Sequence, residues 1–205
     1  VTQVIPQPSC SAANTGKTYN GGTVNPGTYC GATVFNGVRF NQGLYVIASG
    51  NGAGKEGRLT LRGRLDGSAG VSFYFADSKS NLASYRAAEE SVLKAPKTGL
   101  TRGLLFFEGS DRGGKWSLSF DSVNKQTWEG LVYFPAADVV MRSLSEWPKM
   151  NVSLAVNTLQ MISLSTVFTP FAWIPYNATA PVTYDPTVIT HTVSTSTDHP
   201  IHISK

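Results

Sequence analysis

Apolar residues along the chain gather in short runs, and Gly, Pro, Asn and Asp lie between these runs. Residues of these four types commonly end β-strands and form the turns that follow them. We therefore predict short strands for most of the chain. The predicted strands are Arg58–Leu61, Val71–Phe75, Ser91–Lys94, Leu104–Phe107, Trp116–Phe120, Leu131–Phe134 and Val139–Arg142.

Two sequence repeats occur along the chain. The segment PGTYC (26–30) recurs as QGLYV (42–46), and the turn signal Asn36-Gly37 lies between them. The segment GLLFF (103–107) recurs as GLVYF (130–134), which places Asp111 and Asp138 in the same register. Repeat units of about 16 to 27 residues with short strands are more typical of stacked coils than of a hairpin meander.

We therefore predict an all-β fold, a single right-handed parallel β-helix (a solenoid) over residues 1–176. Residues 177–205 are rich in Ser, Thr and Pro and are predicted to form an extended C-terminal tail. Cys10 and Cys30 are separated by about one coil, so we predict a disulfide that pins the N-terminal end of the solenoid. Such a bond implies an oxidising compartment.

One segment does not follow the strand pattern. Residues 80–93 (SNLASYRAAEESVL) place Leu82, Tyr85 and Glu89 at nearly helical spacing. A short helix and a long excursion from a coil both remain open there. Residues 151–175 are apolar and poor in charge, which suggests the last coils.

Composition narrows the class of protein. Charged residues make up 15% of the chain and aromatic residues 11%, which excludes a disordered chain and makes a helical bundle improbable. The net charge is +4, but the densest basic cluster, Arg58, Arg62 and Arg64, alternates with leucines as on the solvent face of a strand. We therefore expect no nucleic-acid partner.

No apolar run is long enough to span a membrane and no signal peptide is recognisable, so we expect a mature product or an excised domain.

Candidate catalytic chemistry is sparse. Asp111 and Asp138 form the same-register acidic pair. Both follow the end of a predicted strand, a position that favours turn capping over a catalytic or Ca²⁺-binding role. Glu108 has Pro135 at its repeat position instead of a second acid. His199 and His202 are interpreted as part of the polar tail, and no metal site, cofactor or catalytic residue is predicted.

The strand aromatics are expected to form the core for the most part. Neighbouring residues of a strand face opposite sides, so one set must point outward. Phe73, Phe75 and Tyr133 are the candidate surface contacts of that outward set.

Five segments in order, PGTYC, QGLYVI, LKAPKTG, GLLFFEG and GLVYFP, resemble the β-helical region of Tad/Flp pilus assembly proteins of the TadE/TadG-like kind. The resemblance spans roughly Cys10 to Met141, and Gln42 stands where that family usually has Pro. It implies an extracellular, non-catalytic domain of a bacterial pilus or surface-attachment system, tethered to the membrane only through an upstream anchor. Its partners would be other pilus or surface proteins, with glycans as a further candidate. The alternatives are a polysaccharide-binding adhesin and a carbohydrate-active β-helix enzyme that uses Asp111 and Asp138.

Overall fold

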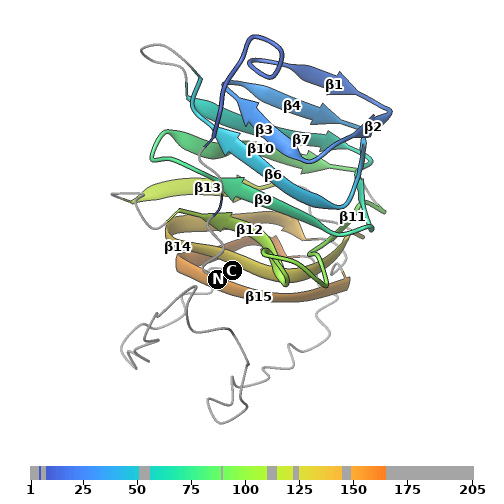
Figure 1. Ribbon diagram of the computed structural model, residues 1–205. Helices are drawn as coiled ribbons and strands as arrows, with labels where there is room; N and C mark the ends of the chain where they lie inside the picture. The colour runs from blue at the N-terminus through green and yellow to red at the C-terminus, as the bar shows by residue number, and fades with distance from the viewer. Residues whose placement is uncertain are drawn as a thin grey trace.

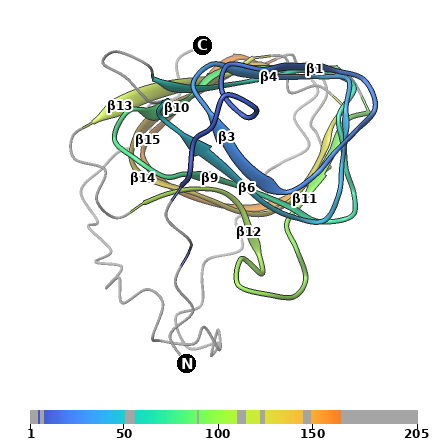
Figure 2. The same cartoon turned by 45° about the horizontal axis from the view of Figure 1, so that its top comes forward.

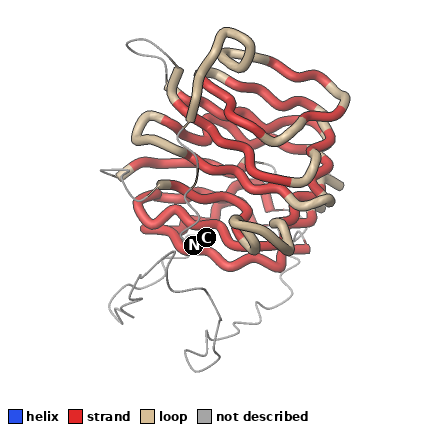
Figure 3. The backbone as a smooth tube through the Cα atoms, viewed as in Figure 1, coloured by secondary structure: helices blue, strands red, loops and turns tan. Residues whose placement is uncertain are grey.

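The computed structural model describes residues 5, 8–50, 56–88, 90–109, 115–121, 125–144 and 149–164. Within these ranges it contains fifteen strands and no helix (Figure 3). All the strands belong to one sheet, and every strand pairing recorded in it is parallel. The predicted tail, residues 177–205, and the end of the predicted solenoid lie outside the described residues.

The strands stack in three columns, here called faces A, B and C (Figure 1). Face A holds β1 (Thr18–Asn20), β4 (Thr33–Asn36), β7 (Gly57–Gly63), β10 (Ser80–Ala87) and β13 (Trp116–Phe120). Face B holds β2 (Thr23–Val24), β5 (Arg39–Phe40), β8 (Asp66–Gly67) and β11 (Val92–Lys94). Face C holds β3 (Gly27–Cys30), β6 (Gly43–Ala48), β9 (Val71–Phe75) and β12 (Leu104–Glu108). The last two strands, β14 (Thr127–Leu144) and β15 (Lys149–Leu164), pair with each other on both sides of a register shift between Phe134 and Asp138.

The chain visits the faces in the order A, B, C, and each strand pairs with the strand of the same face in the next round. Thr18 of β1 pairs with Val34 of β4, and Thr23 of β2 pairs with Arg39 of β5. The sheet thereby curls into a nearly closed, tube-like shape (Figure 2). The prediction of an all-β fold built from stacked parallel strands is confirmed.

The Asn-Gly signal forms the bend between faces A and B. Gly37 has a φ of 63°, a left-handed conformation that glycine adopts without steric cost. The Asn36 amide donates a hydrogen bond of 2.9 Å to Asn20, which occupies the same bend one round earlier. The turn prediction at this position is therefore correct, and the turn joins strands of two faces.

An aromatic ladder runs through the interior along face C. Neighbouring ring centroids are 5.9 Å apart for Tyr29 and Tyr45, 5.6 Å for Tyr45 and Phe73, and 5.1 Å for Phe73 and Phe106. Successive strands of a sheet are about 4.8 Å apart, so one inward ring per round stacks on the next. The interior is therefore filled mainly by aromatic and aliphatic side chains.

The segment from Ser80 to Ala87 is strand β10, so a helix there is wrong. Its register against β7 shifts between Leu82 and Ser84, which makes Ala83 an extra residue in a β-bulge. Leu82, Tyr85 and Ala87 are all buried on the inner side. The bulge changes the usual spacing of two between inward residues to three at one point, and this irregular spacing imitates a helical pattern.

Candidate functional site

The predicted disulfide is present. Cys10 and Cys30 are bonded, with their Cα atoms 5.9 Å apart and 20 residues between them in sequence. Backbone hydrogen bonds from Gly16 to Cys30 (2.8 Å) and from Cys30 to Asn14 (2.9 Å) fix the same segment on the end of β3. The bond indicates an oxidising, extracellular environment, because disulfides rarely persist in a reducing cytosol.

Two of the three predicted surface contacts are core residues. Phe73 and Phe75 have no exposed surface, so their assignment as surface contacts is wrong. Side chains alternate along β9, and it is Tyr74 between them that points to the other side, where its ring lies 4.8 Å from that of Phe107. Which set of an alternating strand faces inward depends on register, and the aromatic pattern alone does not supply it.

Tyr133 belongs to the outward set of β14 and is half-buried, and its role as a surface contact stays a prediction. It pairs with Phe107 across β12 and β14, so it extends the row that Tyr74 and Phe107 begin. Burial, followed by the nearby negative charge of Glu108, raises the pKa of Tyr133.

Asp138 lies on the part of β14 that pairs with β13, opposite Ser117. Its carboxylate accepts hydrogen bonds from Asn157 (2.6 Å) and from Thr158 (2.7 Å) on β15. The hydrogen bonds from Thr158 and then from Asn157 lower the pKa of Asp138. Asp138 is therefore an ionised surface acceptor that links β14 to β15. Its predicted partner Asp111 lies outside the described residues.

Glu108 has a structural role that its sequence position did not reveal. Only 5% of it is exposed, and its carboxylate accepts hydrogen bonds from Trp116 (2.8 Å) and from the backbone of Ala136 (3.1 Å). Ala136 lies where the register of β14 against β15 shifts, between Phe134 and Asp138. A buried carboxylate thus satisfies a backbone donor at an irregular point of the strand.

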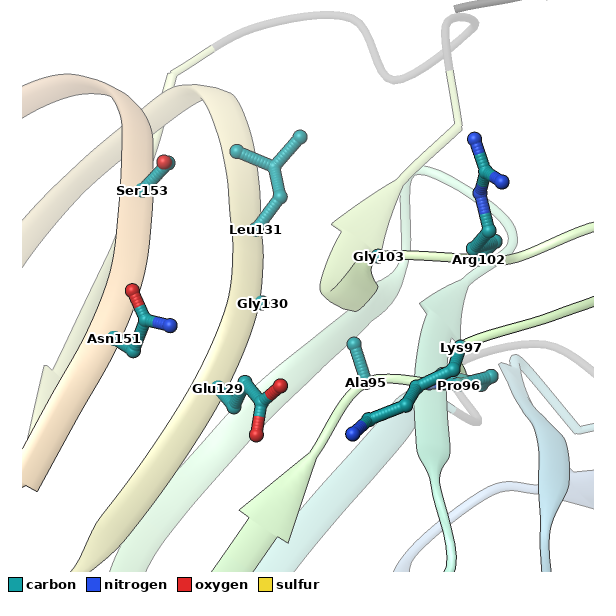
Figure 4. Close-up of a pocket in the computed structure, with 10 residues that line it drawn as sticks. All are labelled: Ala95, Pro96, Lys97, Arg102, Gly103, Glu129, Gly130, Leu131, Asn151 and Ser153. Atoms are coloured by element: carbon teal, nitrogen blue, oxygen red, sulfur yellow. The ribbon is translucent and has the colours of Figure 1, made fainter.

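A groove lies at the corner where the chain passes from face B to face C. At this corner β2 and β3 are joined by Asn25-Pro26, whereas residues 95–103 connect β11 to β12. In the following round, β14 crosses the corner without interruption at Gly130. The longer connection lies beside this part of β14 and borders an open groove of about 450 Å³, here called the corner groove (Figure 4).

The groove has two walls and a floor. Lys97 and Arg102 line the loop side, Asn151 and Ser153 on β15 line the opposite side, and Gly130 lies between them. A Cβ atom at Gly130 would lie 2.5 Å from the Ala95 side chain, and its φ of 131° also disfavours other residues. Glycine therefore lets the ends of the loop rest directly on β14.

Charge in the groove is predominantly positive. Glu129 pairs with Lys94, with 3.6 Å between the carboxylate and the ammonium group. Lys97 and Arg102 are exposed and form no ion pair with any residue of the described ranges. The sequence does not reveal the groove, because its walls come from segments about 50 residues apart. Of these segments, only LKAPKTG, which contains the loop, belongs to a motif singled out in the sequence.

No group of three or more His, Cys, Asp or Glu side chains in the described part of the chain is arranged to hold a metal ion. His199 and His202 lie outside that part. Among the same residues, no helix of the length and apolarity needed to cross a membrane was found.

Comparison of the chain with protein-family models, with curated proteins and with solved structures gave no match. The resemblance to TadE/TadG-like proteins therefore stays a prediction.

Proposed function

We propose that this chain forms a right-handed parallel β-helix and serves as a non-catalytic extracellular structural or interaction domain of a bacterial Tad-type pilus or surface-attachment system. The observation that carries the proposal is the disulfide-closed stack of parallel strands on three faces. Such a stack holds outward side chains at a fixed spacing of about 4.8 Å per round, which suits a rigid display surface.

The order A, B, C of the faces supports the β-helix. Every round returns to a parallel strand of the same face, as in β1 to β4 and β4 to β7. Crossover connections between parallel strands are right-handed in about 98% of cases. An experimentally phased crystal structure tests the hand, and left-handed winding would contradict this part of the proposal.

The non-catalytic part of the proposal is supported by where the acidic side chains lie. Glu108 is occupied by Trp116 and the backbone of Ala136, and Asp138 by two residues of β15. Both carboxylates therefore have structural hydrogen-bonding roles. The pilus assignment itself rests on the five segments between Cys10 and Met141 that resemble TadE/TadG-like proteins.

Cell fractionation tests the location and the partners. Surface appendages are sheared from the source bacterium, purified, and probed with an antiserum raised against the chain. We expect the chain to copurify with pilus filaments and to migrate as a disulfide-bonded form without reductant. Recovery in the cytoplasmic fraction, beside a cytoplasmic marker protein, would contradict the proposal.

A polysaccharide-cleavage assay tests the enzyme alternative. The chain is incubated with neutral and uronic-acid polysaccharides, and the release of reducing ends is measured for the wild type and for Asp138→Asn. We expect no release by either protein. Release that the substitution abolishes would establish catalysis and overturn the non-catalytic role.

A further inference from the structure

The loop beside the corner groove is anchored by hydrogen bonds at its base. The Gly103 amide donates to Pro96 (2.8 Å), and the Leu131 amide donates to Gly103 (2.7 Å), so both ends of the loop are tied to each other and to β14. The hydroxyl of Ser72, which is fully buried, donates to the carbonyl of Leu104 (2.7 Å). A loop anchored in this way loses little conformational entropy when it binds a ligand.

Polar side chains on adjacent strands line up in register along the sheet side of the groove. Lys94, Glu129 and Asn151 follow one another across β11, β14 and β15. Leu131 and Ser153 form the neighbouring pair on the other side of Gly130. An amide and a hydroxyl therefore border a small apolar surface, a combination that suits the hydroxyls and the C–H groups of a sugar ring.

The two loop cations point in different directions. Lys97 extends across the groove toward Glu129, whereas Arg102 points away along the other rim (Figure 4). Glu129 is paired with Lys94, so the loop contributes two positive charges that the described residues leave unpaired. Cations that point in different directions suit a ligand that carries more than one anionic unit along its length.

We propose that the corner groove binds an acidic oligosaccharide, one whose sugar units carry carboxylates. Arg102 receives one carboxylate through two parallel N–H donors, and Lys97 receives a second as a point charge. Asn151 and Ser153 bind sugar hydroxyls, and Leu131 contacts the ring. This inference rests on the proposed extracellular interaction role and adds a site and a ligand class to it.

Calorimetric titration with an oligomer of galacturonic acid at low ionic strength tests the site. The double variant Lys97→Gln/Arg102→Gln is compared with the control Arg58→Gln/Arg62→Gln, whose arginines are exposed on face A. We expect the groove variant to weaken binding by about tenfold or more and the control to leave it nearly unchanged. Thermal unfolding of each variant checks that the fold is retained.

Two further ligands separate sugar recognition from charge alone. A neutral galactose oligomer should bind at least about tenfold more weakly than the acidic oligomer, and polyglutamate should not reproduce its affinity. Absence of binding by the acidic oligomer, equal losses in both double variants, or equal affinity for polyglutamate would each overturn the proposal. None of these results changes the expected copurification with pili, so this proposal can fail while the proposed function stands.

Discussion

Removal of the disulfide between Cys10 and Cys30 is expected to lower the free energy of unfolding by about 3 kcal/mol. The bond closes a loop of 20 residues. In the chain-entropy model at 25 °C, this loop contributes a constant of about 0.6 kcal/mol and a length-dependent part of about 2.7 kcal/mol. For a chain of this size the loss corresponds to a fall in Tm of about 6–12 °C.

Urea unfolding followed by fluorescence measures the change. Cys10→Ala is the informative variant, because it removes the cross-link and leaves the fully buried Cys30 side chain in place. We also expect a larger m value, since the unfolded chain without the cross-link exposes more surface. The double variant Cys10→Ala/Cys30→Ala should lose about 1 kcal/mol more from the small cavity left at Cys30.

Wild-type protein unfolded with a reductant is the matched control, because it has no substituted side chain. The loss common to the reduced wild type and Cys10→Ala is assigned to the cross-link. A loss below about 1 kcal/mol in both would refute the reasoning, since the entropy that the cross-link removes from the unfolded chain would then not determine its contribution to stability.

Three further changes test the interior. Gln126→Leu should cost about 2–4 kcal/mol in urea unfolding, because the fully buried Gln126 side chain bonds Tyr85 and the Ala87 carbonyl, and these groups would lose a partner; a loss under 1 kcal/mol would contradict this. Burial, with a smaller effect of Tyr19, raises the pKa of Tyr29 from 10.0 to about 12, so stability is retained below pH 10 and falls as the pH rises toward about 12. Tyr29→Phe should make this alkaline decline shallower, and an unchanged pH profile would count against the assignment. Phe73→Ala should lower the free energy of unfolding by about 3–5 kcal/mol, because it truncates a core side chain. A near-neutral effect in thermal and urea unfolding would indicate that Phe73 is exposed.

Local sequence patterns predicted some of the strands. The seven predicted runs fall on six of the fifteen strands, since Leu131–Phe134 and Val139–Arg142 both lie within β14. The runs at Arg58–Leu61, Val71–Phe75 and Trp116–Phe120 fall within or coincide with β7, β9 and β13, because short apolar runs between turn-forming residues leave few alternatives. Asn36-Gly37 predicted a bend for a similarly local reason, the tolerance of glycine for positive φ. The disulfide followed from a spacing of about one coil.

Register could not be predicted in the same way. The repeat of GLLFF by GLVYF suggests that Phe107 aligns with Phe134, yet the structure pairs Phe107 with Tyr133. The pairing shifts between Leu104 and Phe106, so Leu105 is an extra residue there. A one-residue bulge is stabilised by packing against the neighbouring strands, and nothing in the local sequence marks it.

Several strands, the bend at Asn36-Gly37 and the pairing of the two cysteines could be predicted from the sequence, since these depend on residue type and on short spacing. The tertiary structure sets the inward direction of Phe73 and Phe75, because stacking against strands that are distant in sequence selects which side of each strand is buried. It also brought the loop at Lys97 beside Asn151, two residues that share no local pattern. A groove formed by consecutive rounds of a stack depends on how the rounds align, and that alignment is a property of the packed fold.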